Sequence, residues 1–294
     1  MRSHYWLLLA AGFAAFSSCQ KSYNPPDLVI SGGTGSGGTG SGSTGSKLVK
    51  YESKGVNTSE STTITYQYDA SGRLTRYDET YVDSSNVATS FYFKYNRDAS
   101  GKVTQVVTNE LAASAPGQGY PDTVVYNIHY PGSSSNFDYA RYSMDLGGGA
   151  LVFRDSSVFV YNGAGEVTDK YSYFGAGPTP LNLSGHYQYT YSNGNITILK
   201  IFDPSSSQST PYGTFNFQYD DKPASLYLGN ESYLPGLDEG FSSKNNPVKY
   251  TITGSGLNES VSYSYQYNTD QRPVTGIIYL VPGKVAYNVK YTYQ

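Results

Sequence analysis

The stretch Thr63–Tyr77, TITYQYDASGRLTRY, decides the fold class of this chain. Ile64, Tyr66 and Tyr68 alternate with Thr and Gln, and successive side chains of a strand point to opposite faces, so the apolar set shares one face. The turn at 69–72, Asp-Ala-Ser-Gly, combines an Asx residue that bonds its own backbone with a Gly that tolerates positive φ. A second extended run follows, and the whole stretch therefore predicts a β-hairpin.

Variants of this hairpin unit recur along the chain. The unit reads aromatic-x-aromatic, Asp or Asn, a turn, then an apolar residue and Thr. The last aromatic residues before the turns are Tyr68, Tyr95, Tyr161, Tyr191, Tyr219 and Tyr267, with degenerate units at Tyr130 and Tyr250. A period of about 28 residues with two strands per unit predicts an antiparallel up-and-down meander of about 14–16 strands, in one all-β domain over residues 47–294.

The expected strand number sets the expected shape. About eight strands close around a space that side chains can fill, whereas 16–18 strands leave a channel. We therefore expect a barrel-like domain that either flattens into two facing sheets or keeps a lumen filled by water or ligand.

Composition supports this fold class and limits the partners. The 294 residues include 32 Tyr, and only 15% are charged, which suits sheet and argues against helix bundles. The formal net charge is −3, and we find no basic cluster. A slightly acidic chain of this kind argues against a nucleic-acid partner.

The tyrosine rows are expected to face inward. Each buried hydroxyl needs a hydrogen-bond partner, which lipid does not offer, and the alternate positions carry polar residues such as Gln188, Thr190 and Lys290. A membrane-spanning barrel would instead show an apolar outward band with aromatic girdles. Regular rows in every unit favour packing by cross-strand aromatic pairs over a stacking platform for sugars, although both readings stay open.

The N-terminus has the pattern of an exported, anchored chain. Arg2 precedes the apolar run Tyr5–Phe16, which is too short to span a bilayer, and two Ser residues and Cys19 follow. We expect residues 1–18 to be a lipoprotein signal peptide and Cys19 to carry the lipid. Residues 19–46 are rich in Gly and Ser and predict a flexible tether. Cys19 is the only Cys in the chain, so no disulfide can form within it.

The sequence nominates no catalytic, cofactor-binding or metal-binding residue. His129 and His186 sit in strand patterns without zinc-like spacing, and we expect both to be exposed. The pairs Asp220-Asp221 and Asp238-Glu239 lie beside turn residues, where acids are common for local bonding reasons. Enzymatic activity therefore has little support from motifs.

Binding sites in such proteins are carried by irregular loops more often than by regular rows. Four long connections stand out as candidates: Ala112–Asp122, Gly175–Leu183, Asp203–Tyr212 and Gly229–Lys244. Thr123, in Asp-Thr-Val, matches a short acceptor pattern for bacterial O-glycosylation, and the same three residues are equally compatible with the start of a strand.

Two resemblances follow from these motifs. The hairpin unit resembles the YD repeats of Rhs-type proteins. The signal peptide with its Cys, the Gly/Ser tether, the hairpins and the segment 243–248, SKNNPV, are together similar to a family of Bacteroidota lipoproteins. That family carries a domain of unknown function described as porin-like. The resemblance implies a barrel fold and an envelope location, and it implies no activity or catalytic residue.

The expected function is that of a non-enzymatic envelope lipoprotein that binds a ligand or partner, with glycans and envelope proteins as candidates. The alternatives are a structural or assembly component of the envelope and, third, a glycan-directed enzyme. The expected membrane contact is the lipid on Cys19 at the outer membrane, with the periplasmic face and the cell surface both open.

We predict that the Cys19→Ala chain is released from the membrane fraction, because the acyl chains are its anchor. Mass spectrometry of the mature N-terminus from native membranes checks the modification, and Ser18→Ala, which keeps a small residue before the cysteine, is the control. A Cys19→Ala chain that still sediments with membranes would contradict the assignment.

Overall fold

The computed structural model describes residues 46–145, 152–177, 179–204, 210–254, 257–281 and 284–294. The signal peptide 1–18, Cys19 and the tether 19–46 except its last residue lie outside the described residues. Their expected roles therefore stay predictions.

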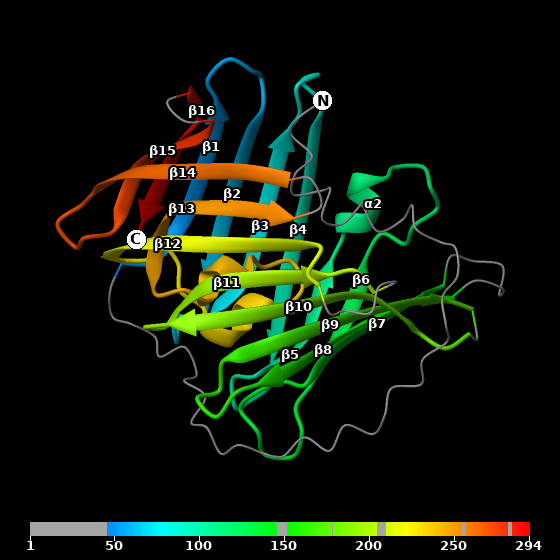
Figure 1. The fold of residues 1–294 in the computed structure, drawn as a ribbon. Coiled ribbons are helices and arrows are strands. Elements are labelled where there is room, and N and C mark those ends of the chain that lie inside the picture. Colours follow the sequence, from blue (N-terminus) through cyan, green and yellow to red (C-terminus); the bar gives the residue numbers. More distant parts are fainter. Residues whose placement is uncertain (1–45, 146–151, 178, 205–209, 255–256, 282–283) are drawn as a thin grey trace.

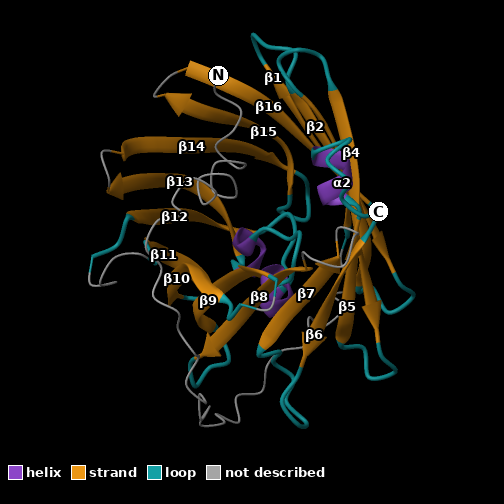
Figure 2. Cartoon of the chain, turned by 90° about the vertical axis from the view of Figure 1, so that its right-hand side faces the viewer, coloured by secondary structure: helices purple, strands orange, loops and turns teal. Residues whose placement is uncertain are grey.

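The described chain forms one closed antiparallel barrel of sixteen strands (Figures 1 and 2). Each strand pairs with the next in sequence, and β1 pairs with β16 to close the ring. The strands are β1 (Leu48–Gly55), β2 (Ser61–Tyr68), β3 (Leu74–Val82), β4 (Ala88–Arg97), β5 (Val103–Thr108), β6 (Val124–His129), β7 (Tyr139–Asp145), β8 (Val152–Tyr161), β9 (Val167–Ala176), β10 (Asn182–Ser192), β11 (Asn195–Phe202), β12 (Gly213–Pro223), β13 (Asn245–Gly254), β14 (Leu257–Tyr267), β15 (Pro273–Val281) and β16 (Lys284–Tyr293).

The short helices are α2 (Glu110–Ser114), η2 (Gly229–Tyr233) and η3 (Glu239–Ser242). Within the described ranges, no helix has the length and apolar character needed to cross a bilayer. The predicted all-β meander of 14–16 strands is confirmed.

The recurring turn has one hydrogen-bond scheme. In the first hairpin, Oδ1 of Asp69 accepts from the backbone N–H of Arg73 at 2.9 Å, and Gly72 has φ +80°. The same Asx-to-backbone bond forms at the equivalent positions Asp98, Asn162 and Asn268. The Asp or Asn of the unit is therefore needed as an acceptor, and the Gly supplies a backbone conformation that other residues rarely adopt.

The Thr of the unit bonds back across the hairpin. Thr75 Oγ1 donates to the carbonyl of Gln67 at 3.1 Å, and the β2–β3 register shifts just after that residue. Equivalent bonds are made by Thr104 and Thr168. The threonine hydroxyl thus gives a hydrogen bond to a backbone carbonyl at a β-bulge, where the register of the two strands shifts.

The tyrosine rows face inward as expected. Tyr66 is only 6% exposed and Tyr189 only 3%, and both belong to the main hydrophobic core with the wall residues around them. Neighbouring rings contact one another across the strands, as in the stacked pair Tyr77 and Phe93 with centroids 5.2 Å apart. The rows therefore pack the interior of the barrel.

The tyrosine hydroxyls near the turns find backbone partners. Tyr68 donates to the carbonyl of Leu48 at 2.6 Å, across from the end of β2 to the start of β1. The same link from the end of one strand to the start of the preceding one is made by Tyr161 to Phe137, Tyr219 to Ile196, Tyr265 to Pro247 and Tyr293 to Pro273. This repeated bond explains why the unit carries Tyr, because a buried hydroxyl without a partner is costly.

Charged pairs lie on the outward face of two strands. Arg76 and Asp78 form an ion pair on β3, and Lys50 and Glu52 form another on β1. A Lys or Arg on the lipid-facing side of a barrel costs about 2–4 kcal/mol at the bilayer midplane. These charged positions on β1 and β3 therefore suit contact with water, in agreement with the polar alternation in the sequence.

The connection between β12 and β13, residues 224–244, folds into the barrel, and we call it the plug. Figure 2 shows its two short helices inside the ring of strands. Leu226, Tyr233 and Leu234 of the plug are buried in the same core as the wall aromatics. The long loop Gly229–Lys244 is thus part of the barrel interior.

The plug also corrects the predicted repeat. The degenerate unit expected at Tyr250 is wrong, because Tyr250 lies in the middle of β13 with no turn directly after it. The plug lengthens the connection at this point of the meander and breaks the period of about 28 residues.

Candidate functional site

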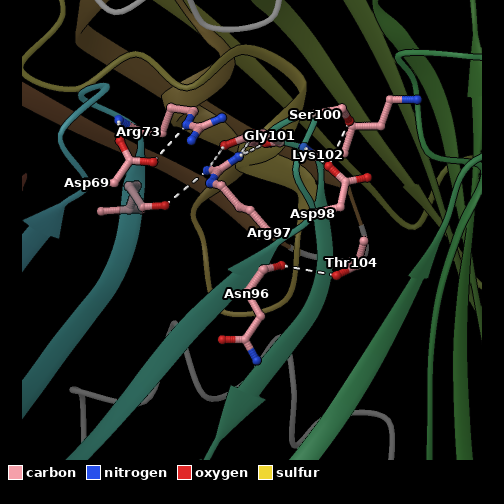
Figure 3. A network of polar contacts seen from close by, with 11 residues as sticks. Asp69, Arg73, Asn96, Arg97, Asp98, Ser100, Gly101, Lys102 and Thr104 are labelled. Carbon is pink, nitrogen blue, oxygen red and sulfur yellow. Dashed lines mark hydrogen bonds and ion pairs between the residues drawn. The ribbon is translucent and has the colours of Figure 1, made fainter.

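One end of the plug is held by an arginine of the wall. The guanidinium of Arg97 donates to both carboxylate oxygens of Glu231, at 2.6 and 2.7 Å, and to the carbonyls of Gly101 and Leu74. The Arg97 side chain is 7% exposed. Figure 3 shows it between the turns that begin at Asp69 and at Asp98. A bidentate pair of this kind fixes orientation as well as position.

The middle of the plug is held by tyrosines. The hydroxyl of Tyr77 donates to the carbonyl of Gly236, and that of Tyr95 to the carbonyl of Pro235 at 3.2 Å. Gly236 has φ +84°, and a Cβ there would lie 2.3 Å from the Phe93 ring. Only glycine fits, so the plug backbone lies directly against the wall at this point.

A cavity of about 170 Å³ lies between the plug and the wall. Its lining joins the plug segment Tyr233–Leu237 to residues from five strands and α2. The wall residues are Phe93, Glu110, Tyr126, Ala140, Asp155, Ser157, Phe159 and Lys170. An apolar cavity of about 150 Å³ holds one benzene molecule, so this space suits a ligand of one ring. Aromatic walls with a few polar groups are typical of small-molecule sites.

The cation of the cavity is already paired. Nζ of Lys170 lies 2.8 Å from Oε1 of Glu239 in the plug, and both side chains are about four-fifths buried. Burial opposes the charge of Lys170, but Glu239, Tyr187 and Asp155 outweigh burial and raise the pKa of the ammonium. Lys170 therefore stays charged, and it is a second ionic attachment of the plug.

Two carboxyl groups of the cavity have no such partner. The side chains of Glu110 and Asp155 accept no hydrogen bond from the described residues, and neither forms an ion pair with them. Burial raises the pKa of Glu110. Burial also raises the pKa of Asp155 to about 6, which nearby Lys170 only partly opposes. The cavity thus presents acidic groups from two different elements to whatever occupies it.

This arrangement fits binding better than hydrolysis. A glycoside hydrolase uses two carboxyl groups whose environments push their pKa values apart, one kept protonated and one ionised. Here burial raises the pKa of both Glu110 and Asp155. Within the described ranges, no group of three or more His, Cys, Asp or Glu is placed to hold a metal ion.

The acidic pairs singled out in the sequence have separate roles. Asp238 accepts from the N–H of Gly240 and caps η3, which is the local bonding expected of a turn acid. Asp220 accepts from the backbone and side-chain amide of Asn246 and from the hydroxyl of Tyr267. Glu239 differs, since it reaches into the lumen to pair with Lys170. Thr123 is exposed in the loop just before β6, and its modification stays a prediction.

The two histidines also differ from each other. His129 is exposed as expected, with its ring stacked on Tyr139. The expected exposure of His186 is wrong, because it is 8% exposed. Its ring lies between Tyr171 and Phe202 at 4.3 and 4.8 Å, and its Nε2 is 2.8 Å from Asp169.

Sequence reasoning missed Glu110, Asp155 and Lys170. For Asp155 a signal exists: it alternates with Ser157 and Phe159, so a carboxyl stands in an inward aromatic row. Glu79 follows Tyr77 in the same way on β3. Glu110 lies on a five-residue helix within a long connection, and no pattern in the sequence marks it.

The geometry defines a closed sixteen-stranded barrel with an inward plug and a small luminal cavity. No protein-family model and no curated protein matches the chain. Among solved structures, a porin-like protein from Bacteroides vulgatus is similar, with 13% identity and a TM-score of 0.48 over 85% of this chain and 99% of that one. A porin-like protein from Bacteroides uniformis gives 13% and 0.48 over 84% and 96%. Likeness at this level carries no functional assignment.

A further inward carboxyl, that of Glu79 on β3, predicts a pH effect on stability. Burial, then the charge of Glu110, raises the pKa of Glu79 to about 7. The Glu79 carboxyl of the unfolded chain loses its proton at a lower pH than that of the folded chain. Glu79 therefore lowers the free energy of unfolding as the pH rises toward and through 7. Glu79→Gln should leave the free energy of unfolding nearly unchanged at pH 5 and raise it by about 1–3 kcal/mol at pH 8.5.

Urea denaturation at the two pH values measures this difference. Asp221→Asn removes a carboxyl whose side chain is 84% exposed and serves as control, with an expected change within about 0.5 kcal/mol at both pH values. If Glu79→Gln does not raise the free energy of unfolding at pH 8.5, the conclusion that burial disfavours the charged form of Glu79 is contradicted.

Proposed function

We propose that this chain is a non-enzymatic, lipid-anchored envelope protein whose barrel lumen binds one small polar ligand, such as a single sugar ring of a glycan. The observation that carries the proposal is the cavity between the plug and the wall, with aromatic surfaces and unpaired polar groups in a space of about 170 Å³. A barrel that served only as a scaffold would need no such groups facing an internal space.

The chemistry of the walls supports a ring-shaped ligand. Phe93, Tyr126, Phe159 and Tyr233 offer apolar faces, and Ser157, Glu110 and Asp155 offer hydrogen-bonding groups. A pyranose ring has both kinds of surface, and ligand sites commonly combine apolar walls with a few polar groups that set orientation. The volume limits the bound part to about one ring, so any longer glycan would extend beyond the cavity.

The anchoring part of the proposal rests on the sequence alone. The apolar run Tyr5–Phe16 and Cys19 support export and lipid attachment, and the tether 19–46 gives the barrel a reach of roughly 30 Å from the membrane. An outer-membrane location follows from this pattern as part of the proposal.

A cavity-filling variant tests the luminal site. Ser157→Phe places a ring inside the cavity, whereas Ser143→Phe places the same ring on the exposed outer side of neighbouring β7. With the purified full chain on an array of monosaccharides and short glycans, we expect saturable binding that Ser157→Phe weakens about tenfold or more and Ser143→Phe leaves intact.

Two results would contradict the proposal. Binding that survives Ser157→Phe would place the ligand elsewhere on the molecule. An array without any saturable ligand would favour the alternative role as a structural component of the envelope.

A further inference from the structure

Acidic side chains outnumber basic ones around the luminal cavity. Three carboxyl groups, those of Glu110, Asp155 and Glu239, lie in or beside it, against the single ammonium of Lys170. Glu239 and Lys170 neutralise each other at 2.8 Å. Asp155 feels the charge of Lys170, but within the described residues neither Asp155 nor Glu110 forms an ion pair, and the two come from different elements, β8 and α2.

Resting on the ligand-binding role above, we propose that the luminal cavity takes a one-ring molecule carrying a protonated primary amine, of which an amino sugar is the type. Three independent observations converge on this class. The volume of about 170 Å³ admits one ring, the aromatic walls offer it apolar contact, and neither carboxyl group has, among the described residues, the ion pair that a primary ammonium would supply.

The same geometry disfavours other ligands. An anion would meet Glu110 and Asp155 with no free cation in the lining, since Lys170 is held by Glu239. A neutral ring offers the two carboxyl groups hydroxyl donors but no positive charge to balance theirs. An ammonium beside either carboxyl group brings the missing charge, because it donates up to three hydrogen bonds and charge-assisted bonds are stronger than neutral ones. Aromatic faces such as Tyr126 and Phe159 add attraction for a nearby cation.

Calorimetric titration of the purified full chain at pH 7 tests the proposal with glucosamine, glucose and N-acetylglucosamine. These sugars share one ring and differ at the amine. We expect glucosamine to bind about tenfold tighter than either neutral sugar, a difference of about 1.4 kcal/mol.

The double variant Glu110→Gln, Asp155→Asn should remove this preference, so that glucosamine and glucose bind with affinities within about twofold of each other. Because the cavity already disfavours charge on both groups, their amides should be tolerated by the fold. Asp221→Asn, on the exposed surface, is the matched control and should keep the preference.

The pH profile is a second readout. The pKa of Asp155 is about 6, so the affinity for glucosamine should fall several-fold from pH 7 to pH 5, while the amine itself stays protonated. Asp155→Asn should flatten this dependence.

The outcomes separate this inference from the proposed function. Neutral sugars that bind as tightly as glucosamine, with binding blocked by Ser157→Phe, would overturn the amine preference and leave the luminal site standing. A glucosamine preference that persists in the double variant would also overturn it. Failure of all three sugars would overturn the inference, and failure of every array ligand would overturn the proposed function as well.

Discussion

A closed barrel of sixteen strands encloses more space than the side chains of its own wall can fill. The other features of this structure follow from the need to fill that space. Large inward tyrosines fill part of the lumen, and the plug fills a further part of it. Each solution brings polar groups inside. Hydroxyls at strand ends therefore donate to backbone carbonyls, as Tyr68 does to Leu48, and Arg97 neutralises Glu231 of the plug. The centre of the barrel is thus occupied by wall aromatics and by the plug.

The wall side chains and the plug leave part of the lumen empty, and the proposed function depends on this space. The plug reaches the wall closely at Gly236 and Phe93, yet beyond that contact the cavity remains, with Glu110 and Asp155 facing it. Burial of unpaired carboxyl groups costs free energy, which is why burial raises their pKa values. A barrel under selection for stability alone could carry apolar residues at these positions. These acids, next to aromatic walls, are the reason for proposing that the lumen binds a ligand.

The local part of the fold could be predicted and the non-local part could not. The turn at Asp69–Gly72 and the inward row ending at Tyr68 follow from alternation and turn chemistry within one hairpin, and their repetition gave the strand number. The plug is different, because Arg97 and Glu231 are 134 positions apart and nothing local marks residues 224–244 as interior. For the same reason the cavity was missed: its lining comes from Phe93 to Leu237, and only the closed ring brings these residues together.

Amide hydrogen exchange of the full chain, followed by mass spectrometry, tests most directly whether the plug is packed inside the barrel. The N–H groups of Leu234 and Leu237 donate within the plug, and their neighbours are buried against the wall. The structure predicts that segment 224–244 exchanges about a thousandfold or more slower than an unstructured chain and opens together with the strands. Exchange of this segment as fast as that of the exposed stretch 116–119, while the strands stay protected, would show a plug that lies outside the barrel and would contradict the account.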